Sequence, residues 1–168
     1  MLLSTGTTMK KYTAIACLIS LYALLTGCGR QPSSVIQPAQ IGNESFQTAG
    51  DYELHYNAVR TDQLTAEIAR SYGIERSKNK VLLNVSMLKK SPSGSSTAQD
   101  AEVTVAARNL NNQLKDVQLR RITENTAIYY IAEVGFSGTE TLVFDISALP
   151  TGSTTPITAT LTREFFAD

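Results

Sequence analysis

The sequence predicts an all-β protein, an antiparallel immunoglobulin-like β-sandwich of about seven strands with one short helix between the first two strands. Three observations favour this class. Apolar and polar residues alternate over many short segments, turn residues recur between those segments, and only one stretch has helical spacing. The cysteine pair and the tryptophan of antibody domains are absent, so a sandwich of different topology or a small barrel stays open.

The chain begins with a segment typical of a lipoprotein signal peptide, residues 1–27. A positively charged start at 9–11 precedes an uncharged, mostly apolar run at 12–25. This run is too short to span a bilayer core of ~30 Å. The residues Leu-Thr-Gly-Cys that end at Cys28 resemble the lipobox of bacterial lipoproteins. We therefore expect Cys28 to be lipidated and to anchor the chain in a membrane, the alternative being an ordinary secreted protein with a chance cysteine.

Residues 28–45 are predicted to form a flexible tether, because they are rich in Gln, Ser, Pro and Gly. The seventeen residues 29–45 have a typical reach of ~20–25 Å, which keeps the following domain close to the bilayer. Gly29 stands where an Asp retains many lipoproteins in the inner membrane. The glycine therefore favours the outer membrane, with the protein facing the periplasm.

Cysteine usage and charge exclude several classes of function. The chain has two cysteines, Cys17 and Cys28, so the predicted domain at 46–168 has no thiol for a disulfide, a nucleophile or a metal. Fifteen basic residues balance fifteen acidic ones, which leaves no basic face for nucleic acid and no polybasic patch for anionic lipid. We expect no cofactor and no metal. The expected partners are the membrane, through the lipid, and an envelope protein.

The first strand and the helix have clear sequence signals. Residues 51–59 alternate apolar and polar side chains, as a half-buried strand does. A helix should follow, with Thr65 as its N-cap and Gly73 just past its end. Leu64, Ile68 and Tyr72 would share one face of it. The helix is too short to be stable alone, so we expect it to close one end of the β core.

The remaining strands follow one another with polar turns between them. Segment 114–122 changes phase part-way, which indicates a bulge or a strand end. The other segments keep a regular alternation, and the polar stretches 91–100 and 150–156 are predicted loops. The predicted strands after the helix are 81–89, 102–109, 114–122, 127–136, 140–147 and 157–166.

Several pieces of the domain resemble one known family. They are 51–58 (DYELHYNA), 64–69 (LTAEIA), 72–77 (YGIERS) and 84–86 (NVS), and the resemblance continues to the end of the last predicted strand. They are similar to the proteobacterial domain-of-unknown-function family numbered 4426. Where that pattern often has Pro, this chain has Ala66, at a first helical position that suits either residue. The resemblance implies a fold and an exported protein, but no activity and no site.

His55 is the first candidate for chemistry. It is the only histidine, and Glu53 and Asn57 share its face of the strand. A histidine oriented by Glu53 could act as a general base, and a hydrolase or a small-ligand site around His55 is therefore our alternative hypothesis. The plainer interpretation is a hydrogen-bonded histidine on a polar strand face. The sequence has no Gly-x-Ser-x-Gly, no calcium loop and no glycine-rich phosphate loop.

A binding surface is the second candidate. Arg60, Arg70 and Arg76 surround the predicted helix and could pair with an acidic partner, although ion pairs with nearby acidic residues are the simpler interpretation. Tyr129 faces away from the predicted core and could form an exposed contact patch. Our leading hypothesis is therefore a non-enzymatic binding or assembly module. Its candidate binding residues are His55, Asn57, Arg60, Arg76 and Tyr129.

Overall fold

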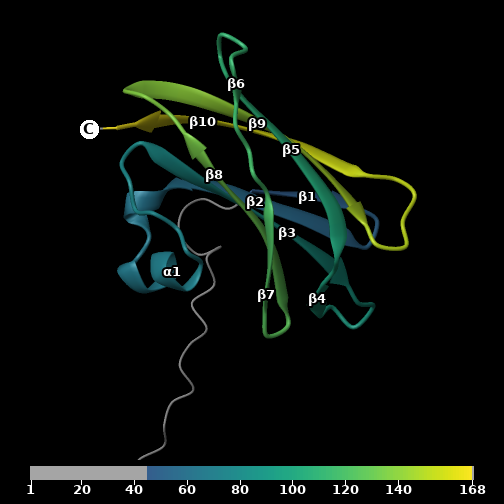
Figure 1. Ribbon diagram of the computed structural model, residues 1–168. Helices are drawn as coiled ribbons and strands as arrows, with labels where there is room; N and C mark the ends of the chain where they lie inside the picture. The colour runs from purple at the N-terminus through teal and green to yellow at the C-terminus, as the bar shows by residue number, and fades with distance from the viewer. Residues whose placement is uncertain (1–44, 168) are drawn as a thin grey trace, which may run out of the picture. The chain divides into compact units, whose positions relative to one another are not determined.

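The computed structural model describes residues 45–167, which form two β-sheets and a short helical segment (Figure 1). Cys28, the signal peptide and nearly all of the predicted tether lie outside these residues. The helical elements are η2 (Thr61–Gln63) and α1 (Ala66–Ser71). The strands are β1 (Ser45–Ala49), β2 (Tyr52–Arg60), β3 (Lys80–Lys90), β4 (Ser96–Ala98), β5 (Ala101–Asn109), β6 (Leu114–Lys115), β7 (Arg120–Glu124), β8 (Ala127–Gly135), β9 (Thr139–Pro150) and β10 (Ile157–Phe166).

The strand order is that of an immunoglobulin-like sandwich. The larger sheet has the order β1-β2-β3-β8-β7, with β4 paired to β3, and the smaller sheet has the order β10-β9-β5-β6. Every strand pair is antiparallel. The series β2-β3-β8-β7 opposite β10-β9-β5 reproduces the four-plus-three arrangement of constant-type immunoglobulin domains. The predicted fold class is confirmed.

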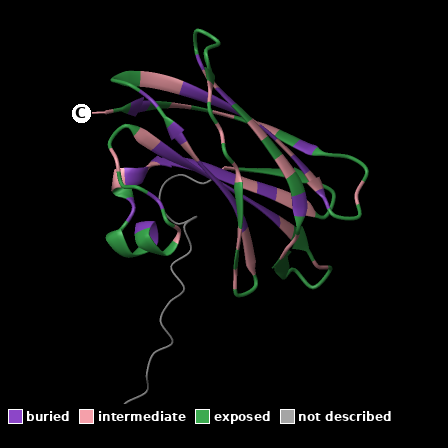
Figure 2. Ribbon diagram, in the orientation of Figure 1, coloured by how far each residue is buried: buried purple, intermediate pink, exposed green. Residues whose placement is uncertain are grey.

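The main core lies between the two sheets. Alternate residues of β2, β3, β8, β9 and β10 point into it, and this explains the period of two in the sequence (Figure 2). Phe144, Leu54, Leu83 and Met87 are among its fully buried members. Burial of such side chains stabilises the fold by about 1.5–3 kcal/mol each.

The helical segment covers the outer face of the larger sheet, so the prediction that it closes one end of the core is wrong. Leu64 and Ile68 from this segment pack on Leu82, Tyr129 and Ile131, which point away from the main core. The local helix signals themselves are confirmed. The Thr65 hydroxyl accepts a hydrogen bond from the Ile68 amide over 3.2 Å, and Gly73 has a φ of +62°.

Strand positions differ from the prediction at three places. The predicted strand 114–122 is two strands, because β6 pairs with β5 in the smaller sheet and β7 pairs with β8 in the larger one. The change of phase in this segment marks the crossing between sheets. β1 and β4 were not predicted, since both are short and polar. No helix in residues 45–167 is long and apolar enough to cross a membrane.

Candidate functional site

His55 lies on the outer face of the larger sheet, next to the partners that the sequence suggests. Its Nε2 is 3.4 Å from Glu53 Oε2, and the ring of Phe46 stacks on it with centroids 5.6 Å apart. Glu53 also forms an ion pair with Lys90 at 2.6 Å. This lysine, followed by His55, lowers the pKa of Glu53. Neither of the two pockets described below includes His55.

Two other predicted binding residues are buried. Tyr129 is 5% exposed and lies beneath the helical segment, so the expectation of an exposed Tyr129 patch is wrong. Asn57 is 4% exposed, and its side-chain oxygen accepts a hydrogen bond from Arg163 over 3.2 Å. Both residues point to the outer face, as predicted, but the helical segment and neighbouring side chains exclude solvent from that face.

The predicted arginine cluster forms in part, around Asp62. Arg60 makes a bidentate pair with the Asp62 carboxylate at 3.0 and 3.1 Å, and Arg76 donates to the Asp62 carbonyl over 2.7 Å. Arg60 also donates to the backbone carbonyl of Phe166, the last residue of β10. Among residues 45–167 the Arg70 side chain has no hydrogen bond or ion pair and does not join the cluster. The arginine interactions therefore connect the end of β2 with the end of β10.

A groove of about 330 Å³ runs between these two strand ends. This volume is at the lower end of the range for ligand sites. Of the residues singled out from the sequence, only Arg60 lines it. The lining residues are Ala58, Val59, Arg60, Gln63, Arg163, Glu164, Phe165 and Phe166.

Arg163 is the residue of this groove that the sequence interpretation missed. It is in phase with the inward-facing Leu161 and Phe165 on β10, so its half-buried side chain points toward β2. There it donates to the Asn57 side chain and to the Ala58 backbone carbonyl. The signal was present in the sequence, because a charged residue in the apolar phase of a strand needs a polar partner inside the fold.

The charge of Arg163 has no counter-ion within the described part of the chain. Its two hydrogen bonds, to neutral oxygens, both come from one terminal nitrogen, and none of the ion pairs in residues 45–167 includes it. The other guanidinium nitrogens are left for a ligand. A guanidinium that is half-removed from water binds carboxylate strongly, because its donors match the two oxygens. The groove can therefore take an anionic group.

A second, more polar pocket of about 260 Å³ lies beside the crossing segment between β6 and β7. Both of its basic side chains have acidic partners. Arg120 is 3.6 Å from Glu133, and Lys80 pairs with Glu75 at 2.5 Å. It is therefore a weaker candidate for a ligand site than the groove at Arg163.

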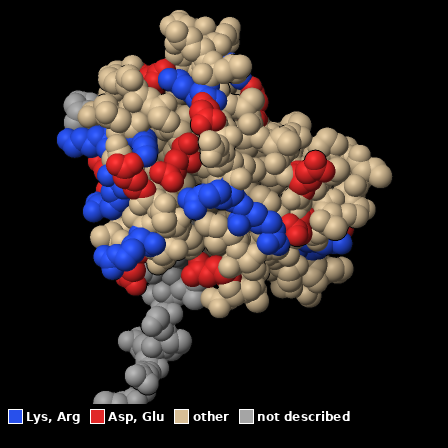
Figure 3. Space-filling model, in the orientation of Figure 1, with Lys and Arg blue, Asp and Glu red and all other residues tan. Residues whose placement is uncertain are grey.

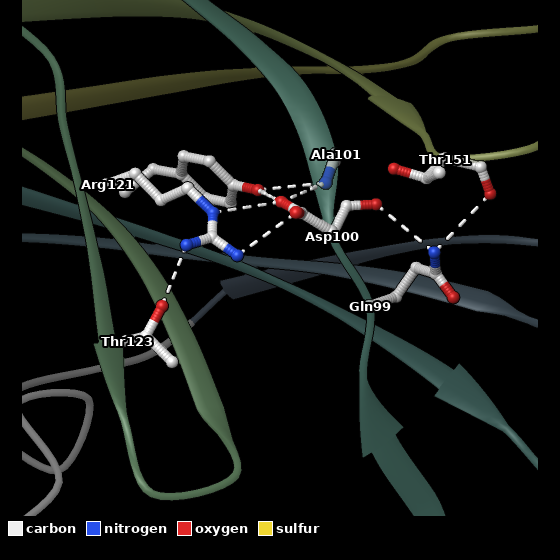
Figure 4. Close-up of polar contacts among 7 residues, drawn as sticks. Gln99, Asp100, Ala101, Arg121, Thr123 and Thr151 are labelled. Carbon is white, nitrogen blue, oxygen red and sulfur yellow. Dashed lines mark hydrogen bonds and ion pairs between the residues drawn. The ribbon is translucent and has the colours of Figure 1, made fainter.

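A third polar cluster surrounds Asp100, where β5 begins (Figure 4). Arg121 from β7 makes two hydrogen bonds of 3.0 Å with its carboxylate, and the Tyr130 hydroxyl donates to it over 2.5 Å. Gln99 donates to the carbonyls of Asp100 and Thr151. These contacts connect both sheets and give the Asp100 carboxylate and its polar neighbours hydrogen-bond partners. The cluster therefore stabilises the fold.

Residues 45–167 contain no group of three or more His, Cys, Asp and Glu side chains that could hold a metal ion. Glu140 is the most enclosed carboxylate of the smaller sheet. It forms an ion pair with Lys115 at 2.7 Å and accepts a hydrogen bond from Asn109 over 2.9 Å. Burial alone would raise the pKa of Glu140, but the hydrogen bonds from Lys115, Asn109 and the Ser137 amide, together with the charge of Lys115, outweigh it and the pKa is lowered. The carboxylate is held in its charged form as part of the fold.

Comparison with known proteins identifies the family. Residues 46–168 match the family model described as Domain of unknown function (DUF4426). The crystal structure of a DUF4426 family protein from Pseudomonas aeruginosa is similar, with a TM-score of 0.62 and 32% sequence identity over 74% of this chain and 96% of that one.

Two further structures are less similar. The yeast GGA1 GAE domain has a TM-score of 0.39 at 13% identity, over 72% of this chain and 98% of that one. The GAE domain of GGA2p from Saccharomyces cerevisiae has a TM-score of 0.32 at 4% identity, over 74% and 96%. Among curated proteins none matches the chain. The family match and the P. aeruginosa structure together confirm the resemblance seen in the sequence: the chain belongs to the DUF4426 family of domains of unknown function.

Proposed function

We propose that this chain is an envelope lipoprotein whose domain is a non-enzymatic binding module. The lipid is carried by Cys28, and the domain faces the periplasm from the outer membrane. The lipobox-like residues 25–28, the charged start and the short apolar run support the anchor, and Gly29 supports the outer membrane. Replacing Cys28 with Ser should move the protein from the membrane fraction to the soluble fraction. Unchanged membrane association would contradict the anchor.

The binding function rests on one observation, the guanidinium of Arg163 beside a groove and without a counter-ion among the described residues. Two more features define the ligand. Arg60 lies in the same groove with its plane fixed by Asp62, and exposed Phe166 adds an apolar wall. We infer that the groove binds an extended segment of an envelope protein that carries a carboxylate next to an apolar side chain.

A hydrolase or a small-ligand site at His55 has less support. The imidazole is engaged by Glu53 and stacked by Phe46, and it lies on the outer sheet face, away from the groove lining. A general base acts on a proton within hydrogen-bond reach, and the groove that offers space for a ligand does not include His55.

Photocrosslinking in intact cells tests the groove. A photoreactive residue in place of Gln63, which lines the groove and is exposed, should give one discrete crosslinked protein. The same residue in place of Thr154, in the exposed β9–β10 turn at the far end of the sheet, is the control. The crosslink from position 63 should disappear in the Arg163→Gln variant.

Two further variants separate loss of binding from loss of folding. Arg163→Lys keeps the charge and should retain part of the crosslink, because an ammonium ion still attracts a carboxylate without the bidentate geometry. Phe166→Ser removes the exposed apolar wall without opening the core, and should weaken the crosslink. A crosslink that persists in a folded Arg163→Gln protein, or no crosslink from position 63, would contradict the proposed binding site.

A further inference from the structure

The turn between β5 and β6 presents two leucines to solvent. Residues 109–114, which we call the leucine tip, read Asn-Leu-Asn-Asn-Gln-Leu and carry no charge. Leu110 is 69% exposed and Leu114 is 78% exposed, the highest values among the exposed large hydrophobic residues described. The tip is the uncharged projection at the top of Figure 3, with charged side chains only at its base.

The leucine tip is held in place by the buried side chain of Asn109. Its oxygen accepts hydrogen bonds of 3.0 Å from the amides of Asn111 and Gln113, and its nitrogen donates to Gln113 at 2.6 Å and Glu140 at 2.9 Å. Asn112 takes a φ of +59° at the turn. The turn is therefore ordered before any contact is made, and binding through it costs little conformational entropy.

The leucine tip lies at the same end of the smaller sheet as the C-terminal end of β10. Asn109 is opposite Leu142 on β9, and Phe166 is opposite Thr139 a few residues further along the same strand. Phe166 is 47% exposed. Three of the four exposed large hydrophobic residues in the described part of the chain therefore gather at this end. Such grouping is less common than single exposed residues and indicates a contact surface.

The described chain also enters the domain near this end. Ala58 on β2 is level with Arg163, because the two are hydrogen-bonded, and Arg163 is opposite Leu142. Ser45, the first residue of β1, is opposite Tyr56, only two residues before Ala58. β1 then runs antiparallel to β2, away from the leucine tip. The sixteen residues between Cys28 and Ser45 have a typical reach of about 20–24 Å, so a lipid on Cys28 would hold Ser45 within about that distance of the bilayer.

We propose that the leucine tip docks into the interfacial layer of the phospholipid bilayer in which Cys28 is anchored. The inference rests on the proposed lipid anchor. Two leucines are too little apolar surface to hold a free protein, since even one myristoyl chain binds only marginally. They suffice to orient a domain that is already tethered, because the second contact is then intramolecular. Arg108 and Lys115, which flank the tip, form ion pairs with Asp145 and Glu140, so the tip itself meets the bilayer as an uncharged surface.

The orientation has a consequence for the groove. With the leucine tip in the bilayer, the end of the sandwich that holds Arg163 and Phe166 faces the membrane. A segment that binds the groove would then approach along the membrane surface. This favours partners that are themselves membrane-bound.

Fluorescence of the full lipidated protein in vesicles of phosphatidylethanolamine and phosphatidylglycerol tests the inference. Cys28 is consumed by the lipid and Cys17 leaves with the signal peptide, so one introduced cysteine can be labelled alone. An environment-sensitive dye at Asn111→Cys keeps both leucines and the Asn109 contacts to the backbone. Its emission should shift to the blue, and spin-labelled lipids should quench it. A dye at Thr154→Cys should show neither effect.

The double variant Leu110→Ser/Leu114→Ser, with the dye at position 111, should reduce quenching to the level of the Thr154→Cys control. Both leucines are exposed, so this variant keeps the fold. Flotation of the vesicles reports the anchor independently. A protein that floats while the dye at position 111 stays unquenched overturns the tip inference alone, and a protein that does not float overturns the anchor and the tip together. A dye that responds only when a membrane protein extract is added assigns the tip to a protein partner and also overturns it.

Discussion

The hydroxyl of Tyr130 donates a hydrogen bond to Asp100 over 2.5 Å and accepts one from the Ala101 amide over 2.8 Å. Tyr130 belongs to the larger sheet, whereas Ala101 begins β5 of the smaller one. One phenol group therefore satisfies the first amide of a strand in the opposite sheet, at a position where β6 does not reach. The contact joins the two sheets at the point where β5 begins.

Tyr130→Phe should lower the free energy of unfolding by about 1–3 kcal/mol, because it leaves the buried Ala101 amide with a single acceptor and removes a bond to a charged group. Urea denaturation measures the change. Tyr56→Phe is the matched control, since Tyr56 lies in the same core and its hydroxyl has no hydrogen-bond partner among residues 45–167. An equal loss in both variants would show that the hydroxyl of Tyr130 has no special role.

Asp100 should make the stability of the domain depend on acid pH. Arg121, followed by Tyr130, holds the pKa of the Asp100 carboxyl below its ordinary value of 3.8. A lowered pKa in the folded state contributes stability that is present above the unfolded-state pKa and is lost as pH falls through the folded-state pKa.

The Asp100→Asn variant should therefore lose less stability than the wild type when the pH is lowered through 3.8 and below. Thermal melts across this range measure the difference. Asp51→Asn serves as the control, because the Asp51 carboxylate has no hydrogen bond or ion pair in the described residues. If the two variants follow the same curve, Asp100 does not carry this acid sensitivity.

Tyr72 connects the helical segment, η2 and α1, to the larger sheet. Its hydroxyl donates to the carboxylate of Glu124 on β7, 52 residues away, and burial, followed by this carboxylate, strongly raises the pKa of Tyr72. Tyr72→Phe should let the helical segment open more often, while the main core stays closed. A hydrogen bond to a charged group is worth about 1.5–3 kcal/mol, so amide exchange in residues 64–74 should rise about tenfold or more.

Mass spectrometry of hydrogen exchange resolves this local effect. Peptides from β9 and β10 should keep their wild-type rates in the Tyr72→Phe protein, because neither strand contributes a residue to the apolar cluster around Leu64 and Ile68. A uniform rise in exchange rate over the whole domain would instead mean that the helical segment and the main core unfold as one unit.

Asn84 and Asn57 face one another on β3 and β2, and their replacement should have opposite effects. The side-chain oxygen of Asn84 is buried and has no hydrogen-bond partner within residues 45–167, whereas that of Asn57 accepts from Arg163. Asn84→Leu should raise the free energy of unfolding by about 1–3 kcal/mol, because it removes the penalty of an unsatisfied group. Asn57→Leu should lower the free energy of unfolding. Urea denaturation measures both variants. A lowered free energy of unfolding in Asn84→Leu as well as in Asn57→Leu would contradict this account.

Most of the sandwich could be predicted from the sequence, because the alternation of an amphipathic strand shows which of its faces is buried. The alternation at 51–59 placed Leu54 and Tyr56 inside, and the helix signals at Thr65 and Gly73 were local hydrogen-bond and backbone requirements. The phase change at 114–122 marked a real strand end. In each case the physical cause acts within a few residues, so a single sequence can show it.

Features that depend on distant segments were harder to predict. Tyr129 is buried because a helical segment more than fifty residues earlier covers it, and alternation alone cannot show such a cover. The continuous apolar runs at 81–83 and 128–132 were the available signal, since strands buried on both faces lose their alternation. For the groove, Arg163 and Ala58 are 105 positions apart, and only the fold brings them together.

The closure of the sandwich by β10 has a consequence for how the domain is made. β10 is the last strand of this domain to be synthesised, and it supplies Phe165 to the core and Arg163 to β2, the second strand. A nascent chain therefore cannot close this core until β10 has been translated. Such distant contacts also make folding slow, on the order of milliseconds to seconds. Slow folding would suit the export that we propose, because a chain that crosses a membrane must stay unfolded until it arrives.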